Sequence, residues 1–282
     1  MTRQKHREGY RDERGAEPGK EWNEKRKSRR RRNRRKARIR FLASMLGTLL
    51  GAVLLVLVAY TALNLFCGFG KVNTQKLREQ GYPESLIALM ERNPETKDFV
   101  LDYPKYKGLE EIDISKEVTK GEIPHFLQWD ERWGYETYGS DFLAVTGCGP
   151  TSLSMVVCGL TGDTKWNPYE VAKMAEDNGY YVDGSGSSWE LMSSGAEKLG
   201  LTVSSVIFDA EHIRATLESG QPIICVMGPG DFTDAGHFLV LTGVDQEGDI
   251  ILQDPNSVER TKQHWDVQKL MNQMKNLWSY RV

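Results

Sequence analysis

The sequence is poor in the residues that bind metals, with four cysteines and five histidines among 282 residues. No two cysteines form a CxxC pair, and no group of cysteines and histidines has the spacing of a zinc site. We therefore predict that the protein holds no metal.

Charge is absent from one long stretch, because no charged residue occurs between Phe41 and Phe66 or before Lys71. A helix of this length would measure about 39 Å and could cross a hydrocarbon core of about 30 Å. A cleavable signal peptide, the competing interpretation, has an apolar stretch of only about 7–15 residues. Lipoprotein signals carry a small residue before the lipid-bearing cysteine, and Phe66 before Cys67 is not small. The sequence predicts a single transmembrane helix over residues 41–66.

The net charge of −2 averages two very different regions. Residues 1–40 carry 18 Lys and Arg against 6 Asp and Glu, and Lys25–Arg40 has twelve basic side chains in sixteen positions. No apolar face can be drawn through that run, so we predict that residues 1–40 form a disordered tail. The positive-inside rule places this tail in the cytoplasm and the chain after about residue 70 outside. Contact of the tail with anionic lipid remains an alternative role, and the adjacent span disfavours nucleic acid as its main partner.

Residues 71–122 have a mixed composition. The stretch Glu84–Arg92 has its apolar residues at the spacing of a short amphipathic helix, which Asn93-Pro94 ends. Residues 96–103 are expected to add another turn or two. We predict a stalk with short helices, and packing of this segment on the following domain is the alternative.

Residues 123–282 form the predicted globular domain, which is long enough to bury one core. Helices are predicted over residues 150–160, 168–178, 188–199 and 211–219, and strands over residues 222–227, 237–244 and 249–253. Ser187 and Glu190 have the spacing of a capping box for the third helix. Helices followed by an apolar sheet indicate an α+β fold.

The sequence Gly147-Cys148-Gly149-Pro150 precedes an apolar run and predicts a cysteine at the start of a helix, with Pro150 at the first helical position. Unpaired N–H groups and the helix dipole favour a thiolate there, and the same groups could bind an oxyanion. The flanking glycines are expected to leave room for a substrate backbone. The alternative is a buried structural cysteine at a tight turn.

The other cysteines of this domain fit that structural role. Cys158 lies about 15 Å further along the same helix and cannot share a site with Cys148. Cys225 falls inside an apolar strand. A disulfide between Cys158 and Cys225 is conceivable outside the cytoplasm, and sequence alone cannot establish it.

His237 is the histidine best placed to act as a base. It opens the apolar strand Phe238–Val244 directly after a glycine-rich stretch, where an imidazole can reach a cleft. Asp254 ends the next strand before Pro255, and neighbouring antiparallel strands bring such ends together. Asp254 is the favoured partner that orients His237, and Asn256 is the second candidate. The alternatives are a structural strand-end histidine and a turn-forming aspartate.

The motifs GCGPTS, GHFLVLTGV and LQDPNS together resemble the C39-like peptidases, a branch of the papain-like cysteine peptidase superfamily. The resemblance covers roughly residues 123–278 and implies a nucleophile helix packed on an antiparallel sheet. It assigns Cys148 as nucleophile, His237 as general base and Asp254 as orienting acid. Family members also use a glutamine upstream of the cysteine to bind the oxyanion, and Gln128 is similar.

Together, the predicted span and the resemblance imply a membrane-anchored extracytoplasmic cysteine peptidase of a bacterium, which acts on peptides or proteins without a cofactor. Bacteriocin-processing members are fused to a transporter for which this sequence has no room, so their double-glycine leader is not the expected substrate. Two other functions remain open. One is hydrolysis of peptide or amide bonds in peptidoglycan, and the other is non-catalytic peptide binding on the same fold.

Overall fold

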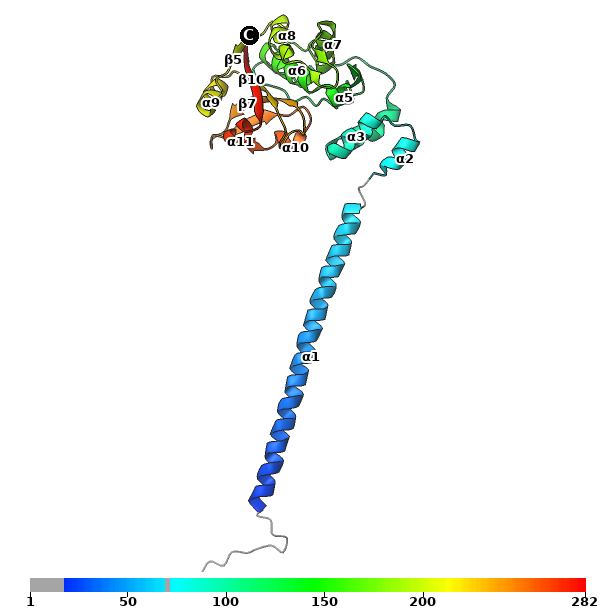
Figure 1. Cartoon of the computed structure of the whole chain (residues 1–282), viewed down its shortest axis with the longest axis vertical. Coiled ribbons are helices and arrows are strands. Elements are labelled where there is room, and N and C mark those ends of the chain that lie inside the picture. Colours follow the sequence, from blue (N-terminus) through cyan, green and yellow to red (C-terminus); the bar gives the residue numbers. More distant parts are fainter. Residues whose placement is uncertain (1–17, 69–71) are drawn as a thin grey trace, which may run out of the picture. The chain divides into compact units, whose positions relative to one another are not determined.

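The computed structural model describes residues 18–68 and 72–282, which divide into two compact units separated after Asn73 (Figure 1). The first unit contains one helix, α1 (Pro18–Gly68). Within it, Arg26–Val56 includes a window of mean hydropathy 2.1, long and apolar enough to cross a membrane. A signal sequence near an N-terminus would meet the same criterion.

The basic segment differs from the prediction, because residues 18–40 are helical and continuous with the apolar part of α1. Residues 1–17 of the predicted disordered tail lie outside the described residues. Arg and Lys are good helix formers, and a segment joined to an existing helix does not repeat the cost of nucleation. The absence of an apolar face therefore did not imply the absence of a helix.

The second unit, Thr74–Val282, begins with five short helices. These are α2 (Thr74–Glu79), α3 (Glu84–Arg92), η1 (Pro94–Thr96), α4 (Lys97–Asp102) and η2 (Tyr103–Lys105). The helix predicted over residues 84–92 is confirmed, with Asn93 as its C-cap.

These helices pack on the domain that follows, so the predicted stalk over residues 71–122 is wrong for this part. Phe99 is 3% exposed and its ring stacks on Tyr135 with centroids 4.2 Å apart. The Tyr135 hydroxyl donates a hydrogen bond to the Phe99 carbonyl over 2.6 Å. Leu86 and Ile87 are fully buried. The apolar face of α3 thus finds a partner in the domain, and the compact unit begins at Thr74 rather than at residue 123.

The main sheet has six antiparallel strands in the order β5-β10-β6-β7-β8-β9. Their bounds are β5 (Thr202–Ser205), β6 (Ile223–Met227), β7 (His237–Val244), β8 (Ile250–Gln253), β9 (His264–Trp265) and β10 (Met274–Arg281). Two small antiparallel pairs accompany it, β1 (Thr137–Tyr138) with β2 (Asp141–Phe142) and β3 (Tyr181–Val182) with β4 (Gly186–Ser187).

The helices of this part cover both faces of the sheet. Their bounds are α5 (Leu143–Thr146), α6 (Cys148–Thr161), α7 (Pro168–Asp177), η3 (Trp189–Met192), α8 (Ser194–Lys198), α9 (Ala210–Glu218), α10 (Val258–Thr261) and α11 (Val267–Met271). In Figure 1 the green helices α6 and α7 lie on one side of the strands, and α9 and α11 lie on the other. The α+β prediction is confirmed.

Coverage of both faces explains why β6 and β7 have continuous apolar sequences. Along β6, Ile224 and Val226 belong to the core beneath α6, whereas Ile223, Cys225 and Met227 belong to the core beneath α9. Alternate side chains of a strand point to opposite faces, so both sets must be apolar. Neither face of β6 or β7 is therefore a polar surface exposed to solvent.

Several elements of the sheet-bearing part differ from prediction, and among them the edge strands β5 and β9 were not predicted. The helix expected over residues 188–199 is divided into η3 and α8 at Ser193, where the dihedral angles are φ −109° and ψ −91°. The Ser187 hydroxyl bonds Tyr138 instead of forming a capping box. Strand β10 was not predicted, although it lies between β5 and β6 in the sheet. Its sequence mixes charged and apolar residues and lacks the continuous apolar run of its neighbours.

If the N-terminal helices are part of the folded domain, Phe99→Ala will destabilise it. We expect a loss of about 3–5 kcal/mol in the free energy of unfolding, because the change leaves a cavity against Tyr135. Urea unfolding of the full chain in detergent, followed by tryptophan fluorescence, measures this. Leu109→Ala, at a side chain that is 39% exposed, should change stability by less than about 0.5 kcal/mol. Equal stability of Phe99→Ala and the parent would restore the stalk interpretation.

Candidate active site

Cys148 is the first residue of α6, with Gly147 as the N-cap. The helix begins two residues before the predicted start at Pro150, which instead lies in the first turn. The missing N–H of a proline costs no intrahelical hydrogen bond at that position. The Cys148 side chain is half-buried and borders a cleft. The helix N-terminus and the thiol are therefore placed together, as the sequence predicted.

The two glycines beside Cys148 are required for packing. A Cβ on Gly149 would lie 2.4 Å from the Ser187 hydroxyl oxygen, and one on Gly147 would lie 2.4 Å from the Leu143 carbonyl oxygen. Both contacts are inside the fold, so packing alone requires glycine at these two positions.

His237 is the first residue of β7 and pairs with Met227 of β6. Its side chain is 6% exposed. Helix α6 packs on β7, which brings the beginning of this strand to the beginning of the helix. His237 thus lies at the start of a strand, directly after residues 228–236, which is the position expected from the sequence.

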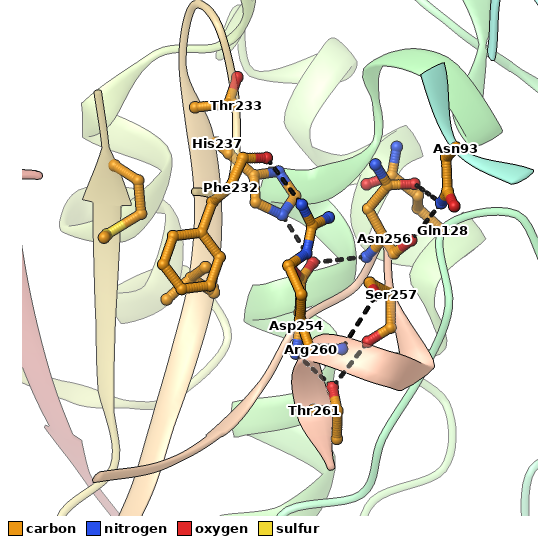
Figure 2. Close-up of polar contacts among 12 residues, drawn as sticks. Asn93, Gln128, Phe232, Thr233, His237, Asp254, Asn256, Ser257, Arg260 and Thr261 are labelled. Atoms are coloured by element: carbon orange, nitrogen blue, oxygen red, sulfur yellow. Dashed lines mark hydrogen bonds and ion pairs between the residues drawn. The ribbon is translucent and has the colours of Figure 1, made fainter. Parts of the chain in front are cut away.

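Asp254 holds the imidazole of His237 from the side opposite the thiol. The distance from His237 Nε2 to Asp254 Oδ1 is 2.7 Å (Figure 2). The hydrogen bond between His237 and Cys148 is therefore left to Nδ1, the other ring nitrogen. Asn256, the second candidate for this role, points its side-chain oxygen at Asn93 Nδ2 over 3.2 Å. The structure thus brings Cys148, His237 and Asp254 into contact, whereas the Asn256 side chain contacts Asn93.

The electrostatic interactions among Cys148, His237 and Asp254 favour the charged forms of Cys148 and His237. Burial by itself would raise the pKa of the Cys148 thiol, but His237 and the N–H groups of Phe238 and Gly149 outweigh it and lower the pKa. Burial would lower the pKa of His237, but the Asp254 charge and hydrogen bond outweigh it and raise the pKa to about 10. These shifts favour a thiolate at Cys148 and an imidazolium at His237.

The buried carboxylate of Asp254 has several further partners. Its Oδ1 accepts a hydrogen bond from the Asn256 N–H over 2.8 Å, and its Oδ2 lies 2.6 Å from Arg260 Nε. The latter is a charge contact without an aligned N–H···O hydrogen bond. Burial opposes ionisation, but His237, Arg260 and the Asn256 N–H together lower the pKa of Asp254. Asp254 is therefore held ionised.

Arg260 and His125 are residues that sequence reasoning missed. Arg260 also donates from Nη1 to the Phe232 carbonyl over 3.1 Å, which ties the loop before β7 to the carboxylate. His125 Nε2 lies 2.8 Å from the Asp254 carbonyl oxygen, and burial lowers the pKa of this histidine. Neither residue has a sequence motif around it, so only the fold identifies them.

Gln128, the side chain to which the resemblance assigns oxyanion binding, lines the cleft. It is 3% exposed and lines the same cleft as Cys148 and His237. Its Nε2 donates to the Ala144 carbonyl over 2.7 Å, and its main-chain N–H donates to the Pro255 carbonyl over 2.7 Å. Since an amide nitrogen carries two hydrogens, one remains for another acceptor. These bonds hold the side chain in one orientation.

The cleft has a volume of about 520 Å³. His237 and Gln128 lie between two walls (Figure 2), and Cys148 lines the same cleft. One wall is formed by residues 230–236, including Phe232 and Thr233, and the other by residues 89–95 and 256–260, including Asn93 and Asn256. A channel between two walls, with a thiol inside it, can accept an extended chain.

The remaining cysteines of the second unit are not placed for the same chemistry. Cys158 lies in the core beneath α6 and Cys225 in the core on the opposite face of the sheet, so the conceivable disulfide does not form and both thiols are free. Burial raises the pKa of Cys158 to about 12 and also raises that of Cys225. Over residues 18–68 and 72–282, no group of three His, Cys, Asp or Glu side chains could hold a metal ion.

The model of the Peptidase_C39 like family matches residues 120–282, more than half of the chain. Among solved structures, a Bacillus anthracis protein described as a C39-like peptidase is 19% identical, with a TM-score of 0.34. That match covers 58% of this chain and 97% of the other. No curated protein matches the chain.

The lowered pKa of Cys148 predicts selective alkylation at mildly acidic pH. At pH 6 a thiol with a pKa of about 8.5 is only about 0.3% ionised. We expect Cys148 in the full chain to react with iodoacetamide at least about tenfold faster than Cys158 or Cys225, as measured by mass spectrometry between pH 5 and 9. In His237→Ala the raising effect of burial is no longer opposed by the imidazolium, so this advantage should disappear. Equal rates for the three cysteines at pH 6 would contradict the charged pair.

Proposed function

The chain belongs to the Peptidase_C39 like family, and on this premise we propose that it is a membrane-anchored cysteine peptidase whose catalytic domain lies outside the cytoplasm. One observation carries the catalytic part of the proposal. Cys148 begins a helix, His237 faces it, and Asp254 Oδ1 lies 2.7 Å from His237 Nε2. This order of nucleophile, base and orienting acid is the arrangement that activates a thiol for acyl transfer.

In the first step the Cys148 thiolate attacks the carbonyl carbon of the scissile peptide bond. Negative charge then develops on the carbonyl oxygen. The main-chain N–H of Cys148, at the beginning of α6, and the free N–H of Gln128 Nε2 are the groups that stabilise it. Gln128 is already bonded to Ala144, so it does not have to be reoriented during the reaction.

In the second step the tetrahedral intermediate collapses and the C–N bond breaks. His237 gives its proton to the leaving amine, and a thioester remains on Cys148. His237, now neutral, takes a proton from a water molecule that attacks the thioester. The carboxylic acid leaves, and the thiolate–imidazolium pair is restored. Asp254 keeps the ring in one orientation through both proton transfers.

Substitution of Cys148 should remove activity without unfolding the protein. In the full chain in detergent, cleavage of a quenched peptide library by Cys148→Ala should fall by at least about 10³-fold. Gln128→Ala should lower kcat by about 10²-fold with a smaller change in KM, because its N–H acts on the oxyanion. Cys158→Ala, on the same helix, is the control and should retain activity. Activity that survives in Cys148→Ala would show that another group is the nucleophile.

The anchoring part of the proposal rests on α1. Apolar side chains such as Leu49 and Leu54 are exposed on this helix, at 65% and 63%. A continuous apolar surface of this kind is stable in lipid rather than in water. The basic run Lys25–Arg40 precedes the apolar part, and the positive-inside rule then leaves the second unit on the outer side.

Protease treatment of intact cells tests this topology. With epitopes at both ends of the full chain, we expect external protease to remove the C-terminal epitope and leave the N-terminal one protected. The protected fragment should stay in the membrane after extraction at alkaline pH. Release of a C-terminal domain that lacks residues 1–66 would show instead that the apolar segment is a cleaved signal.

A further inference from the structure

One wall of the cleft is built by residues that precede the family-matched region. The match begins at residue 120, whereas Leu89, Arg92, Asn93 and Glu95 line the cleft beside Cys148. These residues belong to α3 and the start of η1. The wall is therefore a property of this chain in addition to the family domain.

The wall is fixed to the loop that carries the candidate catalytic aspartate. The Glu95 carboxylate accepts hydrogen bonds from the Ser257 hydroxyl and from the Val258 N–H, the latter over 2.8 Å. Asn93 Nδ2 donates to the Asn256 carbonyl over 2.6 Å (Figure 2). A short segment held by several such bonds has a defined position relative to Cys148 and His237.

The charged groups of the cleft differ in how they are paired. Arg260 contacts Asp254, Asp231 lies 3.0 Å from Lys269, and Glu95 is bonded to the 257–259 segment. Arg92 is exposed, and its Nε donates to a carbonyl of its own helix, Ala88, over 3.2 Å. Among residues 18–68 and 72–282, no carboxylate lies within ion-pair distance of Arg92. Its guanidinium is therefore a cation at the cleft, and its two Nη groups can donate hydrogen bonds to a ligand.

The opposite wall carries an exposed carboxylate. Asp234, in the loop of residues 230–236, lines the cleft and is exposed. A peptide carboxylate in the cleft would be attracted by Arg92 and repelled by Asp234. Arginine binds carboxylates through parallel hydrogen bonds, which gives such contacts a preferred geometry. An acidic side chain of a bound peptide is therefore favoured on the Arg92 side of the cleft and disfavoured on the Asp234 side.

We propose that residues 89–95 form a specificity wall and that Arg92 on it selects peptides with an acidic side chain. The inference rests on the proposed function for the site in which the peptide lies. It does not depend on cleavage, because recognition by Arg92 precedes any bond breaking.

Binding of a position-randomised peptide library to the full chain carrying Cys148→Ala tests the inference. The protein is immobilised in detergent micelles, and retained peptides are identified by mass spectrometry. We expect Asp and Glu to be enriched at one position, about fivefold less so in Arg92→Gln, and replaced by Lys and Arg in Arg92→Glu. Lys198→Gln removes an exposed basic side chain that does not line the cleft, so it is the matched control and should leave the acidic enrichment in place.

Two results would overturn the inference: no acidic enrichment with the Arg92 protein, or the same enrichment with Arg92→Glu. Cleavage by the protein with Cys148 intact separates this inference from the proposed function. If acidic peptides bind through Arg92 and remain uncut, the proposed peptidase activity is contradicted and the selection of acidic peptides by Arg92 is supported. If peptides are cut at the same rate whatever their charge, the proposed peptidase activity is supported and the selection by Arg92 is contradicted.

Discussion

The site depends on keeping one carboxylate ionised inside the protein. Asp254 is fully buried, and an unpaired buried charge costs several kcal/mol. The fold offsets that cost with three groups, the His237 imidazolium, the Arg260 guanidinium and the Asn256 N–H. The Asp254 charge in turn favours the protonated imidazole, and the imidazolium favours the Cys148 thiolate. The reactivity that we attribute to the Cys148 thiolate therefore depends on the negative charge of Asp254.

This dependence extends to residues far from the thiol. Arg260 joins Asp254 to the Phe232 carbonyl in one wall of the cleft, and Glu95 caps the short helix that carries Arg260. Movement of either wall would therefore change the surroundings of the carboxylate as well as the width of the cleft. The helices of residues 74–105 are part of this arrangement, which explains why they pack on the domain.

How much the sequence could predict depended on how local each feature is. Cys148, His237 and Asp254 lie at ends of apolar elements, where glycine and proline mark the boundaries, so their positions could be predicted. Glu95 and Asn93 meet partners about 160 positions away, and nothing in either sequence indicates the pairing. Strand β10 was missed because its burial comes from neighbouring strands rather than from an apolar run of its own.

The sequence by itself determined the apolar helix, the basic run before it, the α+β order of elements and the helix that begins near Cys148. These follow from composition and periodicity over short stretches, which act through local propensity and burial. Tertiary structure alone decided that His237 meets Asp254 rather than Asn256, that Arg260 completes the ion pair, and that α3 forms a wall of the cleft. Those contacts join segments far apart in the chain, and strand order and loop packing set their distances. No local pattern carries that information.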